Sequence, residues 1–253
     1  MKFVAILGIL FISQQALGAS LAGKQVDNRR DNPEERGPYF EGDIILDETQ
    51  GGLRNETYRW PQATVIYDVD PKFTIDEIVQ IQAGIQEIVK KTCIRFKKRV
   101  AETEYVYVQR GAAESGTGCY SSVGRVGGKQ TLNLEVPNCL RLGTVSHEFI
   151  HALGFYHEQS RTDRDEYVTI VWANIRPGLE HNFNKYEADV TDPFNVTYDY
   201  GSVMHYSAYG FAINPVIPTI IPNVPNVEIG QRLGLSASDA LKLNNMYNCS
   251  LSN

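Results

Sequence analysis

The sequence predicts an α+β fold, in which a β-rich region with long helices precedes an irregular last part that ends in a helix. Three observations predict it. Short β-rich runs alternate with an amphipathic helix between Trp60 and His147. Prolines interrupt the chain after His157, and a last amphipathic segment runs from Ser236 to about Tyr247. Strands and helices in one stretch, followed by a less regular stretch, are typical of an α+β domain.

The first strand and the first long helix are predicted from the residues between positions 63 and 88. Residues Ala63–Tyr67 favour a strand, because β-branched and aromatic side chains fit a pleated surface. Thr74 and Glu77 have the spacing of a capping box, which opens a helix. The apolar residues expected on the buried face of this helix are Ile75, Ile78, Ile85 and Ile88.

Further strands and a second helix are expected before the last part of the chain. The β-rich runs are Ile94–Phe96, Tyr105–Val108 and Gln130–Leu134. Gly124 and the pair Gly127-Gly128 mark turns or bulges between them. The second helix is expected to begin between positions 140 and 143.

The last part of the chain is expected to be irregular up to its final helix. Pro177, Pro193 and the stretch from Pro215 to Pro225 break up regular structure there. Ser236 is a suitable N-cap for the final helix. The apolar residues of this helix are Ala240, Leu241, Leu243 and Met246.

The composition and the N-terminus indicate a secreted globular protein. A formal charge of −6 argues against nucleic acid or an anionic membrane as the main partner. Residues 1–18 read as a signal peptide, because Lys2 precedes an apolar run and Ala16-Leu17-Gly18 offers a cleavage site. No later apolar run is long enough to cross a bilayer, so we expect a soluble, extracellular protein.

Residues 19–54 differ from the rest of the chain. Eight acidic and five basic residues and few apolar ones leave this segment unable to build a core of its own. We therefore expect a pro-segment or linker at 19–54, with its boundary between 50 and 54, and a catalytic domain at 55–253.

The cysteine count supports an oxidising compartment. Four cysteines form two disulfides in such a compartment, and three pairings are possible from the residues alone. A second zinc site made from them is not expected, because no two are close in sequence. Possible glycan acceptors are Asn55, Asn195 and Asn248.

The stretch HEFIHALGFYHE at 147–158 predicts a catalytic zinc site. His147 and His151 are one helical turn apart and project from the same face. Gly154 can end the helix in a left-handed conformation, so that His157 supplies a third nitrogen. Three protein ligands leave a position open for water, which marks a catalytic site. Glu148, beside the first ligand, can contact that water.

Two motifs identify the chain as resembling the astacin family of zinc endopeptidases. They are HEFIHALGFYHEQSRTDRD at 147–165 and the Met-turn SVMHY at 202–206, and the resemblance extends from Trp60 to Cys249. It implies a two-lobed metzincin domain with a twisted, mostly parallel N-terminal sheet, two long helices, and an irregular C-terminal lobe with a final helix. No accessory module is expected after Cys249.

The resemblance also implies roles for individual residues. It assigns one catalytic Zn²⁺ to His147, His151 and His157, and the role of general base to Glu148. Tyr206 would be a movable zinc ligand that stabilises the transition state, and Met204 the apolar floor of the site. His181 and His205 are expected to be structural. The implied disulfides are Cys93–Cys249 and Cys119–Cys139.

Two further residues are given roles in latency and specificity. Asp43, in the stretch FEGDI at 40–44, matches the aspartate that blocks zinc in the pro-segment; a plain turn is the alternative. Arg232 matches a residue that lines the primed-side pocket and would favour an acidic residue after the cleaved bond. A surface arginine is the alternative there.

The expected function is hydrolysis of internal peptide bonds by a zinc-activated water, in a zymogen opened by an activating protease. Substrates would be proteins or peptides, added to an exposed strand edge near Gln130–Leu134. The active form would be a monomer, and its new N-terminus would interact with Glu158. The alternatives are a secreted pseudo-protease that acts as a binding protein, and a purely structural zinc.

Overall fold

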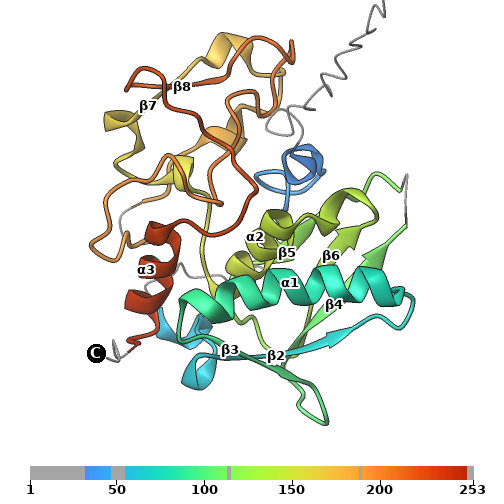
Figure 1. Ribbon diagram of the computed structural model, residues 1–253. Coiled ribbons are helices and arrows are strands. Elements are labelled where there is room, and N and C mark those ends of the chain that lie inside the picture. Colours follow the sequence, from blue (N-terminus) through green and yellow to red (C-terminus); the bar gives the residue numbers. More distant parts are fainter. Residues whose placement is uncertain (1–31, 47–54, 113–114, 188–189, 250–253) are drawn as a thin grey trace, which may run out of the picture.

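A six-stranded sheet forms the base of the N-terminal lobe in this computed structural model, which describes residues 32–46, 55–112, 115–187 and 190–249 (Figure 1). Its strand order is β1-β5-β6-β4-β2-β3, and only the β5–β6 pair is antiparallel. The mostly parallel sheet is therefore confirmed. Its strands are β1 (Ile44–Ile45), β2 (Thr64–Val69), β3 (Arg95–Lys98), β4 (Tyr105–Gly111), β5 (Tyr120–Ser122) and β6 (Lys129–Glu135).

The position of β6 in the sheet contradicts one expectation. The run Gln130–Leu134 lies in β6, which is hydrogen-bonded to β5 on one side and to β4 on the other. It is therefore not an exposed edge. The strand beyond it is β5, and the short strand β1 covers the outer side of β5 by parallel pairing.

Helix α1 (Ile75–Lys91) begins at the predicted capping box. The Thr74 hydroxyl accepts from the Glu77 amide, and the Glu77 carboxylate accepts from the Thr74 amide. The buried apolar face consists of Ile81, Ile85 and Ile88. Ile75, the first residue of the helix, is 81% exposed and does not belong to that face.

Helix α2 (Leu142–Leu153) packs against α1 at a very close approach. A Cβ added to Gly84 of α1 would lie 2.5 Å from Cγ1 of Val145, so only glycine allows this contact. On the sheet side, Phe149 of α2 meets Phe96 of β3 edge-on, with ring centroids 5.2 Å apart. These contacts fix the helix that carries two of the predicted zinc ligands.

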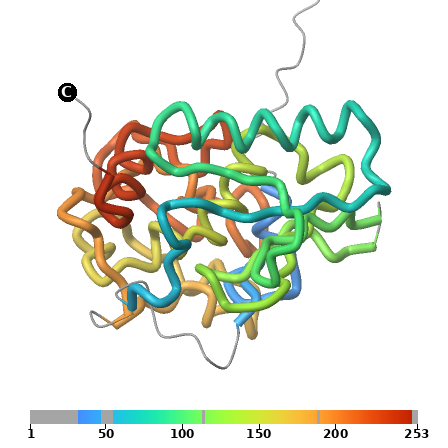
Figure 2. The backbone as a smooth tube through the Cα atoms, turned by 90° about the horizontal axis from the view of Figure 1, so that it is seen from below, coloured from blue at the N-terminus to red at the C-terminus, as the bar shows by residue number. Residues whose placement is uncertain are grey.

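The C-terminal lobe has little regular structure apart from its last helix. A two-stranded antiparallel sheet of β7 (Val168–Ile170) and β8 (Ile220–Pro222) and helix α3 (Ala237–Met246) are its main elements. A capping box of Ser236 and Asp239 opens α3. Leu241 points away from the core and is 43% exposed, unlike the other apolar residues predicted for this helix. Figure 2 shows this lobe, mostly yellow to red, beside the sheet and its helices.

Short 3-10 helices connect these elements. They are η2 (Pro33–Arg36), η3 (Glu56–Tyr58), η4 (Pro61–Ala63), η5 (Asn138–Leu140), η6 (Glu158–Ser160), η7 (Arg164–Glu166), η8 (Trp172–Asn174) and η9 (Glu180–Phe183).

Two buried apolar clusters and two disulfides complete the fold. The larger cluster joins the sheet, α1, α2 and α3, and the smaller one lies within the C-terminal lobe around Phe183 and Tyr206. Cys93 is bonded to Cys249 and Cys119 to Cys139, the pairing that the resemblance implied. Within the described ranges, none of the helices has the length and apolar character needed to traverse a bilayer.

Residues 32–46, here called the N-terminal segment, run between the two lobes (Figure 1). Ile44 and Ile45 pair with β5 of the first lobe. On the other side, the Asn32 side chain donates to the carbonyl of Gly230, and the amide of Glu41 donates to the Asn182 side chain. The segment thus contacts both lobes. The predicted signal peptide and the predicted pro-segment boundary between 50 and 54 lie outside the described residues.

Candidate metal centre

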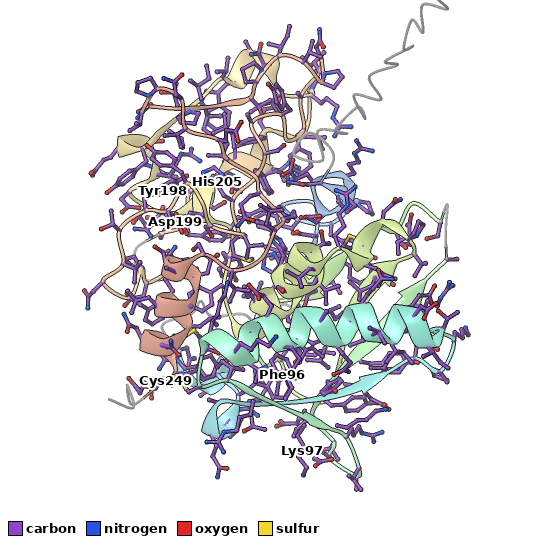
Figure 3. The ribbon with its side chains drawn as sticks, viewed as in Figure 1. Phe96, Lys97, Tyr198, Asp199, His205 and Cys249 are labelled. Atoms are coloured by element: carbon purple, nitrogen blue, oxygen red, sulfur yellow. A yellow bond between two sulfur atoms is a disulfide. The ribbon has the colours of Figure 1, made fainter. Side chains whose placement is uncertain are left out.

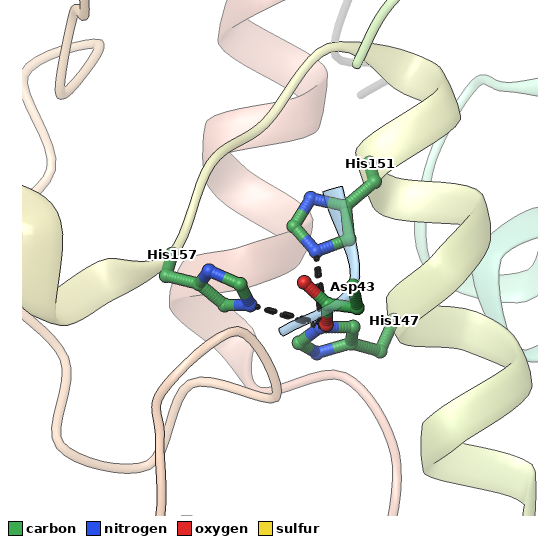
Figure 4. Close-up of side chains that lie close together, drawn as sticks. All are labelled: Asp43, His147, His151 and His157. Carbon is green, nitrogen blue, oxygen red and sulfur yellow. Dashed lines mark hydrogen bonds and ion pairs between the residues drawn. The ribbon is translucent and has the colours of Figure 1, made fainter. Parts of the chain in front are cut away.

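The end of α2 brings the three predicted zinc ligands together. His147 and His151 lie one turn apart on the buried face of the helix. Gly154 follows with φ 113°, the left-handed conformation that was expected, and its amide closes onto the His151 carbonyl. The chain then turns back, and His157 meets the other two rings (Figure 4).

The spacing of the ligand atoms fits a tetrahedral zinc ion. Nε2 of His147 lies 3.1 Å from Nε2 of His151 and 3.3 Å from that of His157. Oδ2 of Asp43 completes the group at 3.0, 3.6 and 3.3 Å from Nε2 of His147, His151 and His157. A tetrahedral ion with bonds of about 2.0 Å places its ligand atoms about 3.3 Å apart. This buried set of three histidines and one aspartate therefore suits one zinc ion.

The outer nitrogen of each ring has its own partner. Nδ1 of His147 lies 2.8 Å from the Val203 carbonyl, and Nδ1 of His151 lies 2.7 Å from the Phe155 carbonyl. Such partners fix the tautomer and direct the Nε2 lone pair at the metal.

His157 differs, because its outer partner comes from the N-terminal segment. Its Nδ1 lies 2.6 Å from Oε2 of Glu41, whose other oxygen accepts from the Ser160 hydroxyl at 2.7 Å. Sequence reasoning missed Glu41. Its only signal was its place two residues before Asp43.

The buried carboxylates of this centre favour a positive charge beside them, either a proton or a metal ion. Burial lowers the pKa of His147 to about 4, so this ring is neutral and can bind a metal. Burial acts in the same direction on His157, but the carboxylates of Asp43 and Glu41 outweigh it and raise its pKa to about 10. Burial would raise the pKa of Asp43, yet the neighbouring histidines hold it well below its usual range.

Glu148 is fully buried beside the first ligand. Neither of its carboxylate oxygens has a hydrogen-bond partner among the described residues. Burial, assisted by the charges of Asp43 and Glu34, raises the pKa of Glu148 well above its usual value. A buried carboxyl group without partners is suited to accept a hydrogen bond or a proton from a bound water.

Tyr206 also contacts the N-terminal segment. Its hydroxyl donates to the Glu41 carbonyl at 2.6 Å, and its ring lies 4.6 Å from that of His157, centroid to centroid. In this arrangement the hydroxyl is held by the segment. Met204 is buried in the larger apolar cluster.

The remaining two histidines lie outside the metal group. Nε2 of His205 lies 2.6 Å from the hydroxyl of Tyr198, within the C-terminal lobe (Figure 3). His181 is exposed at the surface.

Arg232 is buried against the N-terminal segment. Its guanidinium forms an ion pair with Glu34, lies 3.9 Å from Glu35 and donates to the His205 carbonyl at 3.0 Å. Only 9% of the residue is exposed while the N-terminal segment covers it. The two acidic partners could not be found from sequence, since they lie almost 200 positions away.

Glu158 already has charged partners in this structure. It forms ion pairs with Lys242 of α3 and with Arg161, and accepts from the Asp199 amide at 2.9 Å. A cavity of about 40 Å³ lies beside it, lined in part by Tyr186. The pairing with Lys242 had no signal in the sequence.

Comparison with known proteins gives consistent matches. The family model described as "Astacin", a peptidase family, matches residues 52–248. Human meprin A subunit beta is 49% identical over 84% of this chain, and zinc metalloproteinase nas-13 of Caenorhabditis elegans is 44% identical over 83%. The matched regions span 30% and 46% of those two proteins.

A solved structure matches as well. High choriolytic enzyme 1, a hatching enzyme zinc-protease from Oryzias latipes, superimposes with a TM-score of 0.71 at 39% identity. The match covers 77% of this chain and 96% of that one.

Proposed function

The chain belongs to the astacin family of zinc metalloendopeptidases, and we propose that it hydrolyses internal peptide bonds and is made as a secreted zymogen. One observation carries the proposal. Three Nε2 atoms and the carboxylate of Asp43 converge at zinc-binding distances, and Asp43 comes from the N-terminal segment. A carboxylate at the fourth position takes the place that a catalytic site keeps for water.

The residues around the metal have distinct proposed tasks. His147, His151 and His157 hold zinc, which supplies a Lewis acid when bound. Glu148 accepts the proton of the attacking water and passes it to the leaving amine. Tyr206, once released from Glu41, donates a hydrogen bond to the developing oxyanion, a contribution of about 3 kcal/mol for one such donor.

The N-terminal segment belongs to the proposed pro-segment at 19–54, which follows a signal peptide at 1–18 and precedes the protease domain at 55–253. Its position supports this division. Strand β1 covers β5, and Asp43 enters the metal centre. An activating protease would free β5, whose edge replaces Gln130–Leu134 as the proposed docking strand for an extended substrate.

Secretion is supported by the two disulfides, which persist in oxidising compartments. The three sequon asparagines Asn55, Asn195 and Asn248 are exposed, as glycan acceptors must be. We propose that the active form is a monomer.

A protease assay with and without a chelator tests the proposed activity. The activated protein should hydrolyse casein, lose this activity with the chelator and regain it with zinc. Glu148→Ala should retain zinc by elemental analysis but turn over about 10² to 10⁴ times more slowly. If the activated wild type does not hydrolyse casein, the pseudo-protease alternative is favoured. Zinc-dependent folding without hydrolysis would favour a structural ion.

N-terminal sequencing of the active form tests the activation step. The candidate starts are Gly51 and Asn55, and the new terminus is proposed to reach Glu158. To do so it must share or replace the ion pair of Glu158 with Lys242. A start far downstream of Asn55 would contradict the proposal.

A further inference from the structure

The N-terminal segment places two neighbouring carboxylates between the two lobes, and each has its own binding site on the protease domain. Glu34 and Glu35 both lie in η2 and both are buried. The Glu34 carboxylate pairs with Arg232 and accepts from the Thr144 hydroxyl at 3.5 Å. This first site corresponds to the primed-side pocket that the resemblance implied for Arg232, where an acidic substrate residue would bind.

The Glu35 carboxylate is bound at a second site, centred on Ser207. The Ser207 amide donates to Oε1 of Glu35 at 2.5 Å, and the Ser207 hydroxyl donates to Oε2 at 2.6 Å. Both oxygens of one carboxylate are therefore bound by one residue of the protease domain. Within the described ranges, this carboxylate also accepts a hydrogen bond from Asn32 of the same segment, at 2.9 Å.

The second site has the charge and the space that a carboxylate needs. Nη2 of Arg232 has no hydrogen-bond partner among the described residues and lies 3.9 Å from Oε1 of Glu35. A Cβ added to Gly210 would lie 3.1 Å from Oε2 of Glu35, so a glycine leaves room for this group. Burial raises the pKa of Glu35, opposed by Arg232 and Ser207, so the carboxylate depends on these donors.

We propose that Ser207 forms a second carboxylate-binding subsite beside Arg232, which selects peptides carrying a second acidic side chain close to the first. The inference rests on the proposed function, because it requires that substrates enter the space vacated by the N-terminal segment. Ser207 and Arg232 both remain in the protease domain after the segment is removed. A bound peptide would use the same three donors: the Ser207 amide, the Ser207 hydroxyl and the spare Nη2.

Matched peptide substrates test the subsite on the activated protein. The peptides of one series carry a fixed glutamate for Arg232 and a second glutamate one or two positions to either side. The peptides of the other series are identical except that glutamine replaces this second glutamate. For the preferred position, we expect kcat/KM to be about tenfold higher with the second glutamate, as for a hydrogen bond to a charged group. This comparison changes only the substrate, so it requires no variant of the protein.

The Ser207→Ala variant assigns the preference to its residue. We expect the glutamate-to-glutamine ratio to fall from about tenfold to about threefold, because the amide donor remains. Ser238→Ala on α3 is the matched control and should keep the wild-type ratio.

Three results would overturn the inference. If wild type cleaves both series equally well, the second subsite does not exist, although the proposed function stands. If Ser207→Ala keeps the full ratio, Ser207 is not the residue responsible. If the activated wild type cleaves neither these peptides nor casein, the proposed function fails and the subsite fails with it.

Discussion

The N-terminal segment contacts the protease domain through two charged groups that differ in the source of their positive charge. At the metal centre, Asp43 and Glu41 face imidazole rings, which are neutral unless protonated, so a bound proton or metal ion supplies the positive charge. At the other group, Glu34 and Glu35 face Arg232, which is always charged. The positive charge of the first group depends on a bound proton or metal ion, whereas the second group carries a permanent cation. A chelator should therefore weaken only the first.

The largest expected effect comes from removing the permanent cation. Arg232→Gln leaves Glu34 buried without a positive partner, and we expect the free energy of unfolding of the full chain to fall by about 3–5 kcal/mol. Urea unfolding measures this. Adding Glu34→Gln to the same chain should recover most of the loss. If Arg232→Gln is as stable as wild type, the permanent charge of Arg232 does not stabilise the buried carboxylates as we expect.

Replacing Asp43, the carboxylate at the metal centre, should change the hydrolytic activity of the uncleaved chain. Asp43→Ala frees the fourth position, so we expect the uncleaved chain to hydrolyse a casein substrate faster than uncleaved wild type. Glu34→Gln should give a smaller increase, because it leaves Asp43 in the centre. An equal increase in both variants would show that the groups do not have separate roles.

The smallest effect is expected at a partly exposed ion pair, which serves as a reference for the buried one. Arg110 and Glu77 pair at 2.8 Å, and the Arg110 side chain is 28% exposed. Glu77→Gln should lower the stability at pH 7 by less than about 1 kcal/mol. A loss as large as that of Arg232→Gln would remove the distinction between buried and partly exposed pairs.

The pH dependence of this reference pair follows from the pKa of Glu77. Hydrogen bonds from Arg110 lower it to about 2, despite the opposing effect of burial. A lowered pKa stabilises the fold above pH 4.5, and this contribution is lost as the pH falls towards 2. The difference between wild type and Glu77→Gln should therefore disappear over that range in acid unfolding.

Local signals explain which parts of the fold the sequence predicted. The capping box of Thr74 and Glu77 and the left-handed turn at Gly154 depend on residues close in sequence, and both were predicted. Strand β5 has only three residues and is stabilised by its neighbours in the sheet, so no local pattern marks it. Without β5, the run Gln130–Leu134 was mistaken for an edge.

The candidate site divides in the same way. The three histidines and Glu148 lie within eleven positions, and their spacing alone indicates zinc chemistry. The partners of Arg232, and the contact between Glu41 and His157, join distant parts of the chain. Such contacts depend on how the two lobes pack around the N-terminal segment, and no local sequence pattern predicts that packing.

The disulfide between Cys93 and Cys249 makes the protease domain largely a closed loop. It joins positions 156 residues apart, and all three metal-binding histidines lie inside that loop. A single backbone cut anywhere within it, whether by a neighbouring copy or by another protease, yields two pieces that stay covalently joined. The enzyme can thus be nicked in its irregular lobe without its metal-binding residues being separated from the rest of the domain.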